Sequence, residues 1–130
     1  MSNTIHDPTI ININDCFQET EKGTIWYHDR FGSFLINKLN IYSKNDCIYM
    51  YKNGIYVRNE NDILRAIQYY CKNAKENFRR EVNKYIQIAA PVMDVEDNVN
   101  LIGCKNGIYD ISTGELFDYD KKYFMQHKIN

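Results

Sequence analysis

The chain has 130 residues, of which 44% are hydrophobic and 25% are charged, and its formal net charge is −1. This length suits one domain with a single core, and the composition is that of a globular protein and excludes wholesale disorder. The near-neutral balance excludes a generic basic coat for nucleic acids, so any such contact must come from a local patch of cations. No apolar run approaches the roughly 18 residues that a membrane span needs.

The positions of cysteine and histidine limit the chemistry further. None of the cysteines forms a C-x-x-C pair, and His6, His28 and His127 lie far apart, so the ligand spacing of a zinc site is missing. The N-terminus lacks a basic stretch followed by an apolar core, which is the pattern of a secretory signal. We therefore expect a cytoplasmic protein without a metal or a cofactor, whose thiols stay reduced. These are Cys16, Cys47, Cys71 and Cys104.

The N-terminal third of the chain predicts an arm followed by a helix. Residues 1–22 are polar, and we expect a partly ordered arm in which Ile11 and Ile13 form a short edge strand. Thr24–Tyr27 is a short β-prone run. In His28–Leu39, apolar residues recur every four positions, which predicts a short helix. A glycine inside this helix costs roughly 1 kcal/mol relative to alanine.

The strongest local signal is an Asn-Gly pair between two β-prone runs. Cys47–Tyr51 and Ile55–Val57 flank Asn53 and Gly54. Both turn residues tolerate positive φ, so this pattern predicts a hairpin with a two-residue turn.

Two amphipathic helices are predicted next. The first begins at Asn61 or Asp62, either of which can cap it, and its apolar positions continue to Ala74. The second begins near Phe78 and ends before Pro91, because the residue before a proline disfavours the helical conformation. The short polar link indicates that the two helices pack as neighbours.

The C-terminal part returns to β structure. Asn106-Gly107 and Thr113-Gly114 mark turns between β-prone runs. The pentapeptide Lys52–Tyr56 recurs as Lys105–Tyr109, which indicates either a duplicated unit or, more simply, two hairpins with the same turn chemistry. Together these elements predict an α+β fold. Short β-hairpins would pack around a central pair of amphipathic helices, with a shorter helix before them and residues 23–130 as one domain.

Motifs for catalysis are missing from the sequence. A phosphate-binding loop needs G-x-x-x-x-G-K-[ST], and Gly103–Gly107 has neither this spacing nor the lysine after it. Asp94, Glu96 and Asp97 form a solvated loop after Pro91, unlike the paired carboxylates on strand ends that hold two metals. No G-x-S-x-G is present, and no cysteine has a histidine near it in the sequence. We therefore expect no enzymatic activity from this chain.

Charge is distributed unevenly along the chain. Residues 61–90 carry six cations against three acids, whereas residues 91–130 carry four cations against seven acids. If the two helices are nearly continuous, Lys72, Lys75 and Arg79 share one face. Such a face can bind phosphates with salt-sensitive affinity, although more commonly it is the solvated side of an amphipathic helix. The candidate residues for contact with nucleic acid are Lys72, Lys75, Arg79, Arg80 and Lys84.

Tyrosines on the predicted hairpins are candidates for a second kind of contact. They can stack on bases, as in single-strand binders, but such side chains more often form cross-strand pairs or pack on a helix. Tyrosine also buries a large area at a low cost in entropy when it contacts a protein. The candidate interface residues are Tyr49, Tyr51, Tyr56 and Tyr109.

The order of these motifs resembles a known family. An aromatic hairpin containing Asn53–Tyr56 precedes the helices, Glu81-Val82 lies in the second helix, and Asn106–Leu116 reads N-G-I-Y-D-I-S-T-G-E-L. This order is similar to the domain just upstream of the superfamily-3 helicase in primase–helicases of phages, plasmids, pathogenicity islands and poxviruses. The resemblance covers residues 28–129, and Tyr123–Ile129 is similar to the family's link into the helicase.

The resemblance implies an accessory, noncatalytic role: joining primase to helicase, helping the ring assemble, or contacting single-stranded or forked DNA. It implies a superfamily-3 helicase domain as a partner, in cis or in trans, no membrane contact, and an oligomeric state that stays open. It supplies no catalytic residue for this stretch. The alternative is a free-standing protein of a mobile element that binds and modulates a helicase, a host replication protein or a defence protein.

Overall fold

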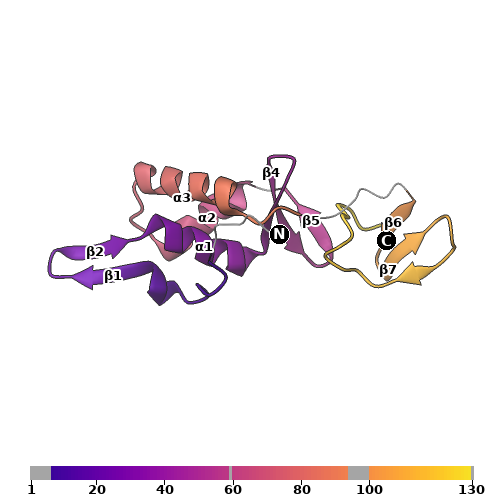
Figure 1. The fold of residues 1–130 in the computed structure, drawn as a ribbon, viewed down its shortest axis with the longest axis horizontal. Coiled ribbons are helices and arrows are strands. Elements are labelled where there is room, and N and C mark those ends of the chain that lie inside the picture. Colours follow the sequence, from indigo (N-terminus) through magenta and orange to yellow (C-terminus); the bar gives the residue numbers. More distant parts are fainter. Residues whose placement is uncertain (1–6, 59, 94–99, 130) are drawn as a thin grey trace.

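The protein is described here from a computed structural model, which covers residues 7–58, 60–93 and 100–129. Within these residues the fold is mixed α+β, as predicted, with three α-helices and three small antiparallel sheets (Figure 1). The strand orders are β1-β2, β3-β4-β5 and β6-β7-β8. The elements are the 3-10 helix η1 (Ile13–Cys16), β1 (Phe17–Thr20), β2 (Gly23–Trp26), α1 (His28–Leu39), β3 (Ile41–Lys44), β4 (Cys47–Lys52), β5 (Ile55–Val57), α2 (Glu60–Tyr70), α3 (Glu76–Ala89), β6 (Leu101–Cys104), β7 (Gly107–Asp110) and β8 (Leu116–Phe117).

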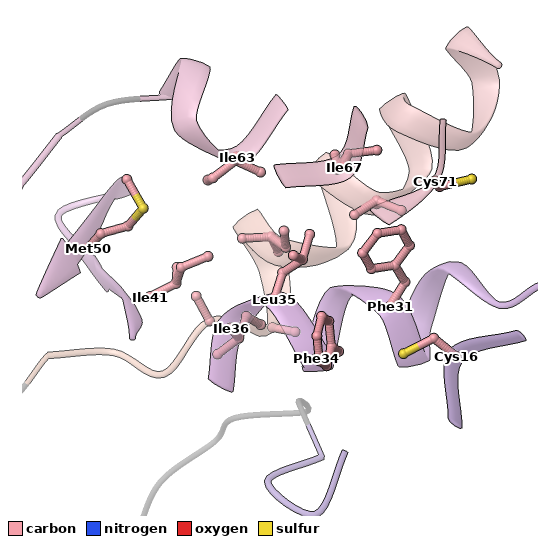
Figure 2. Packing of buried hydrophobic residues seen from close by; sticks show 14 residues of the cluster. Cys16, Phe31, Phe34, Leu35, Ile36, Ile41, Met50, Ile63, Ile67 and Cys71 are labelled. Carbon is pink, nitrogen blue, oxygen red and sulfur yellow. The ribbon is translucent and has the colours of Figure 1, made fainter. Parts of the chain in front are cut away.

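The core is built where the three helices meet the inner face of the β3-β4-β5 sheet. Phe31 and Leu35 of α1 are fully buried, as the periodicity of this helix predicts, and Ile67 of α2 lies in the same cluster (Figure 2). Ile86 of α3 also belongs to this cluster. The helix that packs most closely against α3 is α1 and not α2. The helix before the predicted pair is thus the main packing partner of α3. At 12 residues it is not shorter than α2, which has 11, contrary to the prediction.

Gly32 explains how α1 approaches α3 so closely. A Cβ atom at this position would lie 2.2 Å from Cδ1 of Tyr85, so the tyrosine ring occupies the space that any other residue would need. The hydroxyls of Tyr85 and Ser33 lie 2.9 Å apart in a hydrogen bond next to it. The glycine that weakens the isolated helix is thus required by the packing of the folded one.

The N-terminal segment differs from the expected edge strand. Ile13 begins a 3-10 helix, because the side-chain oxygen of Asn12 accepts a hydrogen bond from the backbone N–H of Asn14 at 2.9 Å and so favours a turn. The strand begins later, at Phe17, whose partner across the β1-β2 hairpin is Trp26. The β-prone run at residues 24–27 is confirmed as β2.

The hairpin around the first Asn-Gly pair is confirmed. Lys52 pairs with Ile55, which leaves Asn53 and Gly54 as a two-residue turn, with φ values of 52° and 89°. A third strand, β3, pairs with β4 and was not expected from the sequence pattern. Tyrosines occupy the outer face of this sheet, opposite the face that Ile41 and Met50 present to the core.

The helix over residues 60–70 is shorter than its apolar pattern. The prediction extends it to Ala74, but α2 ends at Tyr70 and a turn follows, in which the N–H of Ala74 donates to the carbonyl of Cys71 at 3.1 Å. The side chain of Gln68 closes the helix end by donating to the carbonyl of Lys72 at 3.0 Å. Asn73 favours such a turn because its short polar side chain competes with helical hydrogen bonding.

The second Lys-Asn-Gly copy folds with a different turn. In the β6-β7 hairpin, Cys104 pairs with Gly107, so the two loop residues are Lys105 and Asn106 rather than the predicted Asn106 and Gly107. The expectation of identical turn chemistry in the two copies is therefore wrong. Gly107 instead begins a strand, with a φ of 148°.

The C-terminal segment, residues 118–129, joins the two hairpin sheets. The carbonyl of Met125 accepts the N–H of Tyr56 at 2.7 Å, which attaches the segment to the edge of β5. The N–H of Ile129 donates to Gly103 at 2.7 Å, and its carbonyl accepts from Lys105 at 2.9 Å, which attaches it to β6. The chain between these two points crosses from one sheet to the other (Figure 1).

Candidate nucleic-acid interface

The five predicted cations occupy two places around α3. Lys72 and Lys75 lie in the turn between α2 and α3, and Lys75 immediately precedes the first helical residue. Arg80 and Lys84 lie one turn apart on the solvent side of α3, and Arg79 is half-buried on the flank that faces α2. The single face expected from continuous helices does not form, because residues 71–75 interrupt them.

Neighbouring acids reduce the positive charge of this surface. Arg80 pairs with Glu76 at 3.4 Å, and His28 approaches Glu81 at 3.2 Å, all at exposed positions where such pairs contribute little to stability. In the part of the chain that the structure describes, Lys72, Lys75 and Lys84 make no ion pair. These three lysines are therefore the cations most available to phosphate.

Arg65 joins this surface from α2, although it was not among the predicted site residues. With Arg79 and Gln68 it lines an open hollow of about 470 Å³ between α2 and α3. The guanidinium of Arg79 donates to Oε1 of Gln68 at 3.5 Å. The two arginines belong to different helices, and the return of the chain after residues 71–75 brings them together.

The tyrosines of the first hairpin are held within the molecule. Tyr56 is 2% exposed and has no surface to offer a partner in this conformation, contrary to what an interface residue requires. Tyr49 contacts Phe124 edge to face at 5.2 Å between ring centroids, and Tyr51 contacts Tyr56 at 4.9 Å. The C-terminal segment thus covers much of the aromatic face expected to meet bases or a protein.

Burial changes the ionisation of two of these phenols. It raises the pKa of Tyr56 to about 12, with the charges of neighbouring tyrosines and Asp120 acting in the same direction. Burial, then the charge of Asp120, also raises the pKa of Tyr51. Both side chains remain neutral at physiological pH. Lys121 lies over the ring of Tyr51 at 5.9 Å, which adds a cation–π contact from the same segment.

Tyr109, the fourth predicted interface residue, lies on the open side of the β6-β7-β8 sheet. It is 39% exposed and pairs across the strands with Leu116, which is 56% exposed. Ile111 follows on the same hairpin and is 55% exposed. Together these side chains form an apolar stripe that nothing in the described residues covers.

The acidic loop, the thiols and the helices are further candidates for a site or a membrane element. Asp94, Glu96 and Asp97 lie outside the described residues, and among the residues that are described no three His, Cys, Asp or Glu side chains come together as metal ligands. Burial raises the pKa of the Cys16 thiol to about 12, which makes it a poor nucleophile. Across the described ranges, no helix has the length and apolar character needed to cross a bilayer.

Comparison with known proteins identifies the family. A search of curated proteins found no match. A scan of protein families matched residues 16–130 to the family described as "D5 N terminal like". The match covers most of the chain, including every helix and strand from β1 to β8. The chain therefore belongs to the D5 N terminal like family, the domain that lies N-terminal to the superfamily-3 helicase in D5-type primase–helicases.

Proposed function

We propose that this chain is a noncatalytic replication module that works with a superfamily-3 helicase domain, in cis or in trans, in the cytoplasm. The observation that carries this proposal is the family match over residues 16–130. The hydrogen bonds of the C-terminal segment support such a link. Residues 118–129, which include the segment similar to the family's connection to the helicase, are hydrogen-bonded to both β5 and β6.

This attachment explains how the module would orient its partner. A flexible tail would let a following domain reorient freely, whereas a segment hydrogen-bonded at both Tyr56 and Gly103 leaves the molecule in one direction. Tyr119 adds a third point, since its hydroxyl donates to the carbonyl of Cys104 at 2.7 Å. The segment therefore acts as a fixed spacer in this proposal.

We further propose that the surface around α3 contacts DNA through its unpaired lysines. Lys72, Lys75 and Lys84 are exposed, and Arg65 and Arg79 border the adjoining hollow. Contacts of this kind are made with phosphates, so they do not depend on base sequence. They weaken as the salt concentration rises, because the release of counterions from the DNA then gains less entropy.

Charge reversal tests this surface. Fluorescence anisotropy with labelled single-stranded and forked DNA would be measured for the double variant Lys72→Glu and Lys84→Glu at low and moderate salt. We expect binding to be lost at moderate salt, and to show a smaller salt dependence at low salt, by about one unit of slope for each phosphate contact removed. The matched control is Lys105→Glu, an exposed lysine in the β6-β7 loop at the other end of the molecule. Equal binding by the double variant and the wild type would refute the DNA contact.

A second candidate function is favoured by the apolar stripe of Tyr109, Ile111 and Leu116. Exposed apolar side chains that adjoin one another are typical of contacts with protein. A free-standing factor that binds a helicase, a host replication protein or a defence protein would use this stripe. If the reading frame continues into a helicase domain with a Walker motif, the accessory-module proposal is favoured over the free-standing factor. Loss of helicase capture by Tyr109→Ser, with DNA binding unchanged, would assign the stripe to the protein partner in either case.

A further inference from the structure

A cleft of about 850 Å³ separates the β1-β2 hairpin from the end of α2, a size in the range of small-molecule sites. Phe17 and Trp26 line it from the hairpin, and Tyr69 and Tyr70 line it from the helix. Figure 1 shows the hairpin and the turn between α2 and α3 at the same end of the molecule. Four aromatic rings thus surround one open space.

The rings differ in how they are held. Trp26 lies 4.8 Å from Phe17 and 5.3 Å from Phe31, between ring centroids, so it is fixed between the hairpin and the core. Tyr69 stands perpendicular to Tyr70 at 4.9 Å, and yet it is 73% exposed. A ring left in solvent forgoes the burial that stabilises most aromatic side chains. Tyr69 is therefore available to stack on a ligand that enters the cleft.

Polar groups complete the lining. Asn14, Asn73 and Glu19 supply amide and carboxylate groups that can donate to or accept from the edge of a planar ring. Lys72 also lines the cleft, and Lys75 follows three residues later in the same turn. Rings that stack, edge groups that hydrogen-bond, and a lysine without an ion pair together match a base attached to a phosphate backbone. An apolar peptide side chain would leave the edge groups unused.

We propose that this cleft is a subsite for the unstacked bases of single-stranded nucleic acid. One base would stack on Tyr69, opposite the Phe17–Trp26 wall, while Lys72 contacts the neighbouring phosphate. The subsite rests on the DNA contact proposed above and extends it from the phosphate backbone to the bases. A duplex is a poor ligand for it, because its bases are already stacked and paired.

The only tryptophan of the chain lines the cleft, so its fluorescence reports directly on the subsite. Titration with a 12-nucleotide single strand should quench Trp26. A duplex of equal length and a strand with abasic sites should quench it little. Tyr69→Ala should weaken single-strand affinity about tenfold, the usual effect of removing one stacking ring. Lys72→Gln should weaken binding and lower its salt dependence. The matched control is Lys105→Gln, which removes an exposed lysine in the β6-β7 loop at the opposite end.

Each outcome of these experiments either supports or overturns the proposed base subsite. Quenching by the single strand that Tyr69→Ala reduces supports the subsite, and the far-UV circular dichroism of the variant establishes that it is folded. DNA binding by anisotropy without quenching and without an effect of Tyr69→Ala overturns the subsite and leaves the phosphate contact standing. Absence of any DNA binding overturns both and leaves the helicase association untouched. Quenching by an apolar peptide but not by the oligonucleotide overturns the subsite and assigns the cleft to a protein.

Discussion

The same five residues, Lys-Asn-Gly-Ile-Tyr, form two hairpins that differ in register. In the β4-β5 hairpin, Asn53 and Gly54 make the turn, whereas in the β6-β7 hairpin the turn is made by Lys105 and Asn106. Because side chains alternate across a strand, a shift of one residue relative to the turn exchanges the two faces. Tyr56 is accordingly buried in the first copy, and Ile108 is the fully buried residue of the second.

The surroundings of the two hairpins account for this difference. The C-terminal segment covers the tyrosine face of the first hairpin, where the carbonyl of Lys121 accepts a hydrogen bond from the Tyr56 hydroxyl. In the second hairpin, β8 approaches so closely that a Cβ at Gly107 would lie 2.6 Å from the carbonyl oxygen of Phe117. A glycine at this position is therefore required by a neighbouring strand, and at Gly54 it is required by the turn and by the ring of Tyr119. Because the two local sequences are identical, the register of each hairpin is set by the segments that pack against it.

The largest difference in stability between the two copies should appear when their tyrosines are replaced. Tyr56→Ala removes a buried ring, and we expect it to lower the free energy of unfolding by about 3–5 kcal/mol. Tyr109→Ala removes a ring that is 39% exposed and should cost about 1 kcal/mol. Urea denaturation of the two variants measures both values. Equal losses would contradict the exchange of faces.

The isoleucines should show the reverse order. Ile108→Ala opens a cavity at a site with 0% exposure, and we expect a loss of about 2–4 kcal/mol in the free energy of unfolding. Ile55, its counterpart in the first copy, is only half-buried, so Ile55→Ala should cost about 1 kcal/mol. The same denaturation experiment gives the comparison. A greater loss of stability at Ile55 than at Ile108 would contradict the burial of Ile108 in the core.

A smaller effect should appear as a dependence on pH. Tyr56→Phe keeps the ring but leaves the Lys121 carbonyl without its donor, which should cost about 1 kcal/mol below pH 10. Because the pKa of Tyr56 is raised to about 12 from its usual 10.0, the folded wild type holds this proton more tightly than the unfolded chain. Its stabilising contribution is therefore complete below pH 10 and is lost as the pH rises from 10 to 12.

Stability of the wild type and of Tyr56→Phe, followed across this range, measures the contribution of the one phenol. The difference between the two proteins should shrink as the pH rises, since the other titrating groups are common to both. Tyr109→Phe is the matched control for the removal of a phenol, because it leaves the Lys121 carbonyl with its donor. A difference that stays constant from pH 9 to 12 would show that burial does not hold the Tyr56 proton.

The smallest effect should distinguish the two turns. Asn53 has a φ of 52°, a conformation that alanine adopts at a cost of roughly 1 kcal/mol, so Asn53→Ala should be destabilising by about that amount. Asn106 has no positive φ, and Asn106→Ala should change stability by less than about 0.5 kcal/mol. The midpoint of thermal unfolding is sensitive enough for this comparison. A larger loss of stability for Asn106→Ala than for Asn53→Ala would contradict the difference between the two turns.

Local signals predicted the elements that show a clear periodicity or a recognisable turn pair. The helix over residues 28–39 and the turn at Asn53-Gly54 follow from periodicity and from the φ that each residue tolerates. The predicted end of α2 at Ala74 is wrong. Cys71 and Ala74 continue the helical spacing of apolar residues, but the backbone turns after Tyr70. Tyr69 was overlooked as a site residue, although an aromatic side chain off the apolar stripe of its helix was the available signal.

The sequence by itself determined the α+β composition of this protein, the family to which it belongs, and the positions of most helices and strands, because propensity, capping and turn chemistry act over a few residues. Tertiary structure alone decided which copy of the repeated pentapeptide buries its tyrosine. It also decided which cations adjoin one another and that four aromatic rings from β1, β2 and α2 line one cleft. These arrangements depend on contacts between residues far apart in the chain, and no local pattern encodes such contacts.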